Sequence, residues 1–419
     1  MRVWCLAIIL GACASARGGA GDPLDSGADS IDAGASDGAN VPATDAPISA
    51  CGTVGVVDVA TGPIGSRLPT LVWNGSRYAL AFQTDVSPER AQFAFADADG
   101  ELVPGSIRAV NASGDVGQLT PTIAWSGTEY LVMYTAARNG DDIEVARVGA
   151  NGEPIAGSVV RLPTMTGDNG WGSVAWDPID HVWGAEWINL QGYATTARFA
   201  RLSSTGAKLG EVQANTGTDC CMLNYLNARV VWSGARFAIA WETKGSLHVS
   251  EITGAGAVTT PAVFPSDSTA WDPQSVALVS NGAGYAIVYT DRDDATGNFV
   301  VHFARTDGGG YIAGSDHVIS NPGAFGDNPS VVWTGSEYGV TWSERGGANV
   351  NEIWSARLDA SGALIDGTRQ QLTCGGKSNL WPEIAWDGTR YGIAYEHDVN
   401  GPEQAVHMIV GTVAGGGPQ

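Results

Sequence analysis

The sequence predicts an all-β protein in which seven blades, each of four antiparallel strands, form one β-propeller. Three observations lead to this prediction. A motif of a proline, a tryptophan, a glycine turn and a second aromatic strand recurs seven times. A turn that ends in glycine recurs with the same period. The last repeat lacks one strand, and an unmatched strand at the start of the domain can supply it.

The first marker is clearest in residues 121–134, where the chain reads PTIAWSGTEYLVMY. Three other copies keep the proline, the tryptophan and the glycine, and the copies near residues 176, 232 and 280 are weaker. Consecutive copies lie 48 to 54 residues apart, a length typical of a four-stranded blade. The aromatic residue that begins the second strand is Tyr78, Tyr130, Trp183, Phe237, Tyr285, Tyr338 and Tyr391. The fixed position of these rings favours packing between blades over a sugar-binding platform.

The strands within one repeat follow from alternation and turn residues. The segment from the proline to the tryptophan predicts the first strand, and a Ser-Gly or Asn-Gly turn leads to the second. In the second repeat, Ile143–Arg147 predicts the third strand and Ser158–Leu162 the fourth. The second marker lies in the turn between these two strands, at Gly100, Gly152, Gly206, Gly256, Gly310, Gly362 and Gly416.

The ends of the domain indicate how the ring closes. The seventh repeat has only three strands and ends near Val413. The domain starts with an unmatched apolar segment, Val54–Ala60. We therefore expect this segment to complete the seventh blade, and we assign residues 51–419 to the propeller.

The N-terminus is typical of a signal for export. Val3–Leu10 is an apolar run too short to span a bilayer. The residues Leu10-Gly11-Ala12-Cys13 resemble a bacterial lipobox, which implies a signal peptide over residues 1–12 and a lipid on Cys13. The alternative is an ordinary signal peptide cut at a nearby A-x-A-like site. Ala14 after the cysteine favours the outer membrane or the cell surface.

Residues 13–50 are predicted to be a flexible tether. From residue 14 they contain no aromatic residue and are rich in Gly, Ala, Ser, Asp and Pro, so they cannot bury enough apolar area to fold. The whole chain has 44 acidic and 22 basic residues, a net charge of −22. This balance argues against nucleic acid and against adsorption to anionic lipid, so we expect membrane contact through the lipid anchor only. We expect a monomer.

The cysteines leave the disulfide pattern open. Cys5 belongs to the signal peptide, and Cys51, Cys220, Cys221 and Cys374 remain for pairing in an oxidising compartment. Four cysteines allow three pairings, of which a vicinal Cys220–Cys221 bridge is one candidate. Their spacing matches no zinc site.

Strand directions place the variable loops on one face of the propeller. These are the loops between the second and third strands and the links between blades, and they are rich in acidic residues. The candidate binding residues there are Asp115, Asp168, Asp293, Asp327 and Glu344. Such clusters could bind Ca²⁺, but no segment has EF-hand spacing or a G-G-x-G-x-D repeat. We therefore expect no cofactor, with Ca²⁺ as the alternative.

The innermost strands offer a second candidate site. The residues three positions before the blade tryptophan are Thr70, Thr122, Ser173, Arg229, Ala277, Ser330 and Glu383. Arg229 and Glu383 are the two that are not small, and they could form a polar site in the pore. The alternative is a pair of solvent-exposed charges without a function.

Motifs for catalysis are missing from the sequence. It has no S-x-D-x-G-x-T-W box, no G-x-S-x-G elbow and no H-x-x-x-H pair. Two carboxylates that act on a glycosidic bond need no sequence spacing, so they stay open as an alternative.

The W-x-G-x-x-Y repeat, together with the lipobox and the acidic tether, resembles the repeat propellers of lipoproteins from myxobacteria and related bacteria. The resemblance covers residues 51–416 and implies a structure rather than a catalytic residue. We predict a lipid-anchored binding or scaffold module whose acidic face contacts a surface protein, a peptide or a glycan. The alternative is an exported polysaccharide hydrolase or lyase with paired carboxylates at the pore mouth.

Overall fold

The computed structural model describes residues 47–48, 57–58, 65–112, 116–138, 140–163, 167–191, 194–215, 229–243, 246–254, 256–265, 274–307, 310–346 and 349–413. The chain divides into two units, 1–43 and 44–419, and all described residues belong to the second. Among these residues, no helix has the length and hydropathy that a membrane span requires. The predicted signal peptide and Cys13 lie outside them.

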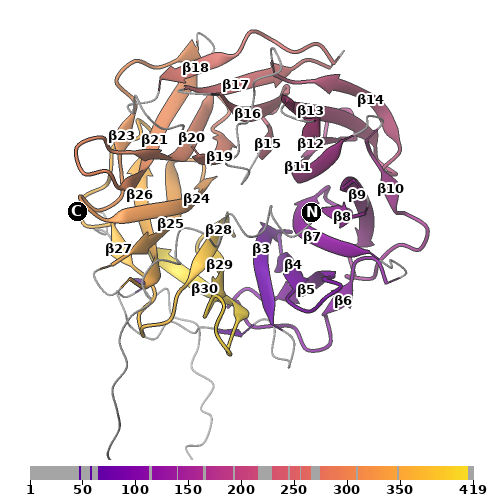
Figure 1. The fold of residues 1–419 in the computed structure, drawn as a ribbon, viewed down its shortest axis with the longest axis horizontal. Helices are drawn as coiled ribbons and strands as arrows, with labels where there is room; N and C mark the ends of the chain where they lie inside the picture. Colours follow the sequence, from indigo (N-terminus) through magenta and orange to yellow (C-terminus); the bar gives the residue numbers. More distant parts are fainter. Residues whose placement is uncertain are drawn as a thin grey trace, which may run out of the picture. The chain divides into compact units, whose positions relative to one another are not determined.

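Seven small antiparallel sheets surround a central axis, which confirms the seven-bladed propeller (Figure 1). Within each blade the chain runs from the pore outward. Blade one contains β3 (Ser66–Trp73), β4 (Tyr78–Thr84), β5 (Ala91–Ala96) and β6 (Arg108–Ala109). Blade two contains β7 (Gly117–Trp125), β8 (Glu129–Ala137), β9 (Asp142–Gly149) and β10 (Val160–Arg161). Blade three contains β11 (Asp168–Asp177), β12 (Val182–Gln191), β13 (Ala194–Ser203) and β14 (Lys208–Gln213).

The remaining four blades repeat this order. Blade four contains β15 (Arg229–Trp232), β16 (Phe237–Thr243), β17 (Ser246–Ile252) and β18 (Ala262–Pro265). Blade five contains β19 (Gln274–Ser280), β20 (Tyr285–Arg292), β21 (Phe299–Asp307), and the short β22 (Gly310–Tyr311) and β23 (His317–Val318), which both pair with β21. Blade six contains β24 (Phe325–Trp333), β25 (Glu337–Arg345), β26 (Asn351–Asp359) and β27 (Gln370–Gln371). Blade seven contains β28 (Leu380–Trp386), β29 (Tyr391–His397) and β30 (Ala405–Val413).

The start of the chain completes blade seven, as predicted. In β2 (Val57–Asp58), Val57 pairs with Met408 and Asp58 with His407, antiparallel to β30. This strand lies inside the predicted Val54–Ala60 segment, whose other residues lie outside the described part of the chain. A second short strand, β1 (Pro47–Ile48), pairs in parallel with the end of β30. It falls within the predicted tether of residues 13–50.

The repeated aromatic residues lie between blades. Tyr130 and Tyr338 have no exposed surface, and each apolar cluster combines residues of two neighbouring blades. The tyrosine hydroxyls also bind the neighbouring blade. Asn74 Nδ2 donates a hydrogen bond of 2.6 Å to Tyr130 Oη, and Tyr391 Oη donates one of 2.7 Å to Glu337 Oε1. These contacts support the interpretation of the series as packing residues.

In six blades the innermost strand contains a β-bulge, which we did not predict from the sequence. In blade four the corresponding residues lie outside the described part of the chain. The first strand was expected to begin at the proline of the motif, but it begins upstream, and the proline lies within the bulge. This position suits proline because the extra residue of a bulge is left out of the ladder. The bulge residue has a left-handed φ of 47–57° in six blades, at Leu68, Thr120, Trp171, Ser275, Asn328 and Trp381.

The small residues of the innermost strands join adjacent blades. Ser173 Oγ accepts a hydrogen bond of 2.7 Å from the backbone N–H of Val230 in blade four. Thr70 Oγ1 donates one of 3.2 Å to the carbonyl of Pro121 in blade two. These side chains therefore satisfy backbone groups that no sheet ladder reaches.

Replacing Ser173 by alanine is expected to lower the free energy of unfolding by about 1–2 kcal/mol. The substitution leaves the buried N–H of Val230 without its acceptor, and such a group destabilises the folded state by roughly that amount. Urea denaturation measures the change. Ser336→Ala, in an exposed turn, is the matched control and should change stability by less than about 0.5 kcal/mol. Equal effects of the two substitutions would contradict the role of Ser173.

Candidate functional site

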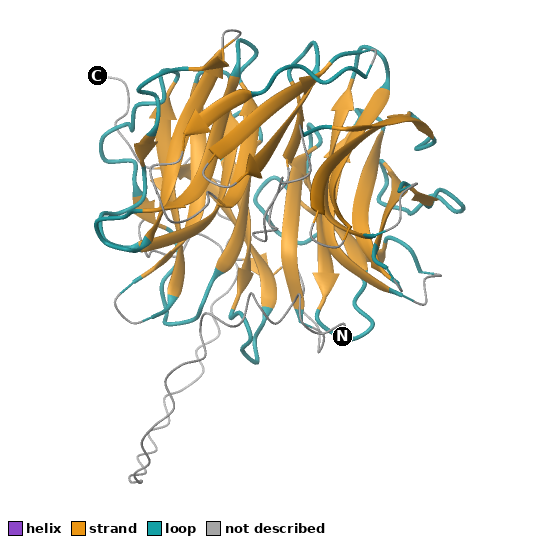
Figure 2. Cartoon of the chain, turned by 45° about the horizontal axis from the view of Figure 1, so that its top comes forward, coloured by secondary structure: helices purple, strands orange, loops and turns teal. Residues whose placement is uncertain are grey.

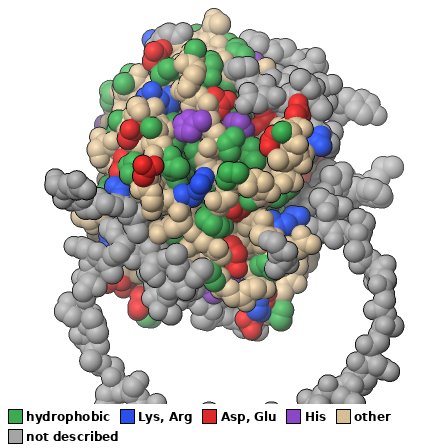
Figure 3. Space-filling view, turned by 90° about the vertical axis from the view of Figure 1, so that its left-hand side faces the viewer, with side chains coloured by type: hydrophobic (Ala, Val, Ile, Leu, Met, Phe, Trp, Pro, Cys, Tyr) green, Lys and Arg blue, Asp and Glu red, His purple; other side chains and the backbone are tan. Residues whose placement is uncertain are grey.

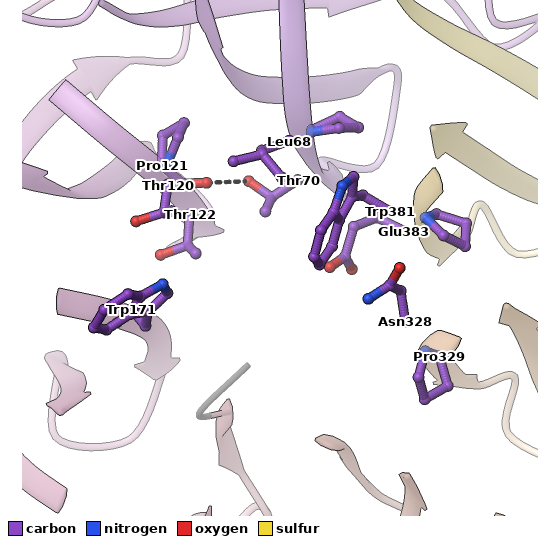
Figure 4. A pocket seen from close by; sticks show the side chains of 13 residues that line it. Leu68, Thr70, Thr120, Pro121, Thr122, Trp171, Asn328, Pro329, Trp381 and Glu383 are labelled. Atoms are coloured by element: carbon purple, nitrogen blue, oxygen red, sulfur yellow. Dashed lines mark hydrogen bonds between the residues drawn. The ribbon is translucent and has the colours of Figure 1, made fainter. Parts of the chain in front are cut away.

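A pocket lies at the mouth of the central pore, on the side where the innermost strands begin. That side carries the links between blades, and loops extend from both ends of the strands (Figure 2). The pocket contains about 610 Å³ of space not filled by protein, part of which is open to solvent. Its walls come from β3, β7, β11, β24 and β28, and Figure 4 shows the side chains. The lining residues are Leu68, Pro69, Thr70, Thr120, Pro121, Thr122, Trp171, Gly172, Asn328, Pro329, Trp381, Pro382 and Glu383.

Three of the lining residues are large and apolar, and two of them are aromatic. Trp381, Leu68 and Trp171 are bulge residues with left-handed φ values of 57°, 51° and 51°. A left-handed φ is uncommon for residues other than glycine and is strained for bulky ones. Figure 4 shows Trp171 and Trp381 on different sides of the pocket. The bulge thus turns one side chain of each of these blades toward the pore mouth.

The lining beside Trp381 is polar (Figure 4). Glu383 and Asn328 come from adjacent blades, and their polar atoms point toward one another in Figure 4. Ser330 Oγ donates a hydrogen bond of 3.0 Å to Glu383 Oε2. Asn328 is only 4% exposed. Its Nδ2 atom and the Oγ1 atom of Thr122 are buried and have no hydrogen-bond partner within the part of the chain that the structure describes.

Side chains of the preceding blade hold the backbone of two bulge residues. The N–H of Thr120 donates a hydrogen bond of 2.8 Å to Gln83 Oε1 of blade one. The N–H of Leu68 donates one of 3.2 Å to Glu396 Oε2 of blade seven. Gln404 Nε2 donates to the other oxygen of Glu396 at 2.6 Å, and burial raises the pKa of Glu396 to about 7. The seam between the last and first blades therefore repeats the contact between blades one and two.

Of the predicted site residues, Glu383 lines this pocket. Arg229 begins β15, but the structure does not describe its side chain, so the predicted pairing with Glu383 stays a prediction. Asp115, Cys13, Cys220 and Cys221 lie outside the described residues.

Two of the predicted acidic residues are held inside blade six. Asp327 Oδ1 accepts hydrogen bonds from Ser275 Oγ at 2.8 Å and from the N–H of Asn328 at 2.7 Å, and burial raises the pKa of its carboxyl group. Glu344 is 4% exposed and accepts a hydrogen bond of 3.0 Å from Trp342 Nε1. Both carboxylates therefore support the fold around the pocket.

Of two other predicted residues on different blades, Asp168 is exposed and Asp293 is partly exposed. Asp168 begins β11 of blade three and accepts a hydrogen bond of 3.3 Å from the N–H of Asp141. Asp293 follows β20 of blade five and accepts hydrogen bonds of 2.8 Å from Thr296 Oγ1 and the N–H of Ala295, which lower its pKa. Ligand binding by these acidic residues stays a prediction.

The described residues contain no group of three or more His, Cys, Asp or Glu side chains that could hold a metal ion. Cys374 is the one cysteine among them, and it is disulfide-bonded. One outer side of the molecule mixes acidic, basic, polar and apolar side chains without a large patch of one kind (Figure 3).

One feature of the sequence marks the pocket, although it was not predicted as a site. Trp171 and Trp381 lie outside the repeated aromatic series, five residues before the blade tryptophans Trp176 and Trp386. The matching residues in other blades vary in type, at Leu68, Thr120, Ser275 and Asn328. A position whose residue type differs between blades, at a fixed distance from packing residues that recur, is a candidate for ligand recognition.

Comparison with known proteins adds information on the fold. No protein-family model matches the chain, and no curated protein matches its sequence. An α-L-arabinanase from Penicillium chrysogenum, solved with arabinobiose, has 10% identity and a TM-score of 0.51 over 71% of this chain and 93% of its own. An α-L-arabinofuranosidase from Fusarium graminearum has 12% identity and a TM-score of 0.49 over 70% and 92%. A neuraminidase-like protein of A/little yellow-shouldered bat/Guatemala has 11% identity and a TM-score of 0.46 over 87% and 99%. These identities are low, so the likeness concerns the fold alone.

Proposed function

We propose that the protein is a non-catalytic binding module that takes its ligand in the pore pocket. The observation that carries the proposal is the lining of the pocket, in which the bulge residues Trp381, Trp171 and Leu68 surround an open space together with a few polar groups. Ligand sites typically combine such apolar residues with a small number of placed polar side chains. Strained backbone at one position of several blades indicates a functional constraint there.

Binding is favoured over catalysis by the ionisable groups of the pocket. Glycoside hydrolysis generally needs two carboxyl groups about 5–10 Å apart. Among the described lining residues, Glu383 is the only one with an ionisable side chain. A polysaccharide hydrolase is the second candidate, because Glu383 lies at the pore mouth where such chemistry would take place. Release of reducing sugar that is lost in Glu383→Gln would support this second candidate.

The lipid anchor predicted at Cys13 fits the binding role. A protein held at the outer membrane or cell surface by one lipid can present the pore mouth to material outside the cell. We include this location, together with a surface protein, peptide or glycan as the class of ligand, in the proposal. Proteinase accessibility on intact cells tests the location independently of binding.

Replacing Trp381 by asparagine is expected to weaken ligand binding about tenfold or more. Asparagine occupies the same bulge position in blade six and tolerates a left-handed φ, so the backbone should be retained. Burial of a large apolar side chain contributes about 1.5–3 kcal/mol, which corresponds to this loss. The full-length chain is screened against oligosaccharides, including arabinobiose, and against peptides.

Leu209→Asn is the control for this substitution. Leu209 is 59% exposed on the outer strand β14 and does not line the pocket. The control should bind like the wild type. Wild-type affinity of the Trp381→Asn variant for whichever probe binds would exclude the pore pocket as the binding site.

A further inference from the structure

We propose that the pocket binds a neutral sugar ring, with adjacent hydroxyl groups on Asn328 and Glu383 and its apolar face against Trp381. This inference rests on the proposed binding role and names the chemistry of the ligand. It depends on the polar lining residues Asn328, Thr122 and Glu383 and not on the tryptophan rings alone.

The amide of Asn328 requires a hydrogen-bond acceptor. Its side chain is 4% exposed, lines the pocket and has an Nδ2 atom without a partner among the described residues. Buried polar groups in folded proteins are nearly always paired, and an exception calls for an explanation. A ligand oxygen in the pocket supplies one.

Thr122 supports the same conclusion from another side of the pocket (Figure 4). Its Oγ1 atom is also buried and without a partner in the described part of the chain, and the residue lines the pocket. A hydroxyl group can donate and accept, so a ligand hydroxyl satisfies it in either direction. Two residues on β7 and β24 that line one pocket thus each have a buried polar atom without a partner among the described residues.

Glu383 supplies the complementary acceptor. An ionised carboxylate accepts about four hydrogen bonds and donates none. Its Oε2 atom accepts one from Ser330 Oγ at 3.0 Å, and the carboxylate and the Asn328 amide point toward one another in Figure 4. An amide donor beside a carboxylate acceptor matches two adjacent hydroxyl groups, each of which donates one bond and accepts another.

The charges around the pocket disfavour other ligand classes. Its described lining residues include the carboxyl group of Glu383 and no Lys or Arg, so an anionic sugar would find no positive partner there. A cation would suit Glu383 and a tryptophan ring. The cationic group itself offers no acceptor to Asn328 Nδ2, so a neutral polyhydroxyl ligand explains more of the site.

The test measures binding of defined probes to the full-length chain by calorimetry. The neutral probes are xylotriose, arabinotriose and maltotriose, the anionic probe is trigalacturonate, and the cationic probe is choline. We expect at least one neutral trisaccharide to bind more tightly than trigalacturonate and choline. Asn328→Asp should weaken that binding about tenfold or more, because the donor is replaced by a negative acceptor. Thr122→Val should weaken it severalfold.

Two further variants keep the result interpretable. Asn328→Gly retains the left-handed backbone, removes the amide and should show the same loss if Asn328→Asp folds poorly. Asn151→Asp is the matched control, because Asn151 lies in an exposed turn at the opposite end of the strands and its Oδ1 atom accepts the turn hydrogen bond from the N–H of Glu153, which aspartate can keep. We expect it to bind within about twofold of the wild type.

Three results would overturn the inference: binding of none of the neutral probes, tighter binding of trigalacturonate or choline, or wild-type affinity of both Asn328 variants. The proposed binding role fails in a different way. If Trp381→Asn leaves the binding of every active probe unchanged, the pocket is not the site. If that variant abolishes binding of a peptide while no sugar binds, the pocket is the site and its ligand is not a neutral sugar.

Discussion

Replacing Gly392 by valine is expected to lower the free energy of unfolding by about 3 kcal/mol. Gly392 lies in β29 of the last blade, and a Cβ atom there would be 2.5 Å from Cε1 of Tyr78 and 2.6 Å from its Cζ. Tyr78 belongs to the first blade and has no exposed surface, so its ring cannot move aside into solvent. Overpacking of this kind destabilises proteins by about 1–3 kcal/mol, and the two methyl groups of valine place this case at the upper end. Urea denaturation measures the difference.

Gly210→Val provides the control for this substitution. Gly210 lies in the outer strand β14, and a Cβ atom there would meet no atom within 4 Å. The two substitutions add the same atoms to a strand glycine, so their difference isolates the contact with Tyr78. A loss of stability at Gly392 no larger than that at Gly210 would show that the ring closure tolerates the added volume.

The same contact occurs between other blades, which makes the expectation general. A Cβ atom at Gly339 would lie 2.3 Å from the ring of Tyr391, and one at Gly184 would lie 2.6 Å from the ring of Phe237. In each case the glycine follows the repeated aromatic residue of its own blade and receives that of the next one. Closure of the ring therefore uses the same packing as any other pair of blades, although Tyr78 and Gly392 are far apart in the chain.

This regularity explains why the fold could be predicted from the sequence. Every blade must offer the same space to its neighbour, so Tyr130 and Tyr338 recur at one spacing and the number of blades can be counted. The missing outer strand of the last repeat follows from the same count, and β2 supplies it. Periodicity carries this information because each blade packs only against its neighbours.

The candidate site could not be predicted in the same way, because it depends on features that do not repeat in residue type. The left-handed backbone at Leu68, Thr120 and Trp381 involves residues that usually avoid this conformation, so their identity gave no sign of it. The loop position of Glu344 suggested exposure, whereas its carboxylate is buried against Trp342. A sequence shows which residues carry charge but not which backbone or side-chain donors will meet them after folding.

Glu396 lies where the last blade packs against the first, and it contacts a residue of the pocket. It is 2% exposed and accepts a hydrogen bond from the N–H of Leu68, whose side chain lines the pocket. Its neighbour across the ladder is Leu380, the residue before Trp381. Arg67 and Asp85, which form an ion pair of 3.2 Å, are the charged groups close to it. Burial raises the pKa of Glu396 from 4.5 to about 7. Between these two pH values the folded protein therefore keeps a proton on this carboxyl group that the unfolded chain has released.

Replacing Glu396 by glutamine is expected to stabilise the protein by about 3 kcal/mol at pH 8 and to have little effect near pH 4.5. Between these values the unfolded chain is ionised and the folded protein is protonated at this site, so the stability of the wild type falls as the pH rises from about 4.5 to 7. Glutamine does not titrate, and its amide oxygen can accept the hydrogen bond from Leu68. A pKa difference of about 2.5 corresponds to roughly 3 kcal/mol. Urea denaturation at several pH values measures the gap between the two proteins.

The reciprocal substitution, Gln83→Glu, is the control for this prediction. Gln83 is 1% exposed and accepts a hydrogen bond from the N–H of Thr120 in blade two, as Glu396 accepts one from Leu68 in blade one, so Gln83→Glu places a carboxyl group at an equivalent buried position. Gln83→Glu should therefore acquire the decline in stability between about pH 4.5 and 7 that Glu396→Gln removes. If the wild type and Glu396→Gln instead keep a constant difference across this range, burial of the Glu396 carboxyl does not govern the pH response of the seam. If the decline in stability with pH appears in Gln83→Glu and disappears in Glu396→Gln, a single buried carboxyl group causes it. In the wild type that group belongs to Glu396, which also holds the backbone of the pocket residue Leu68.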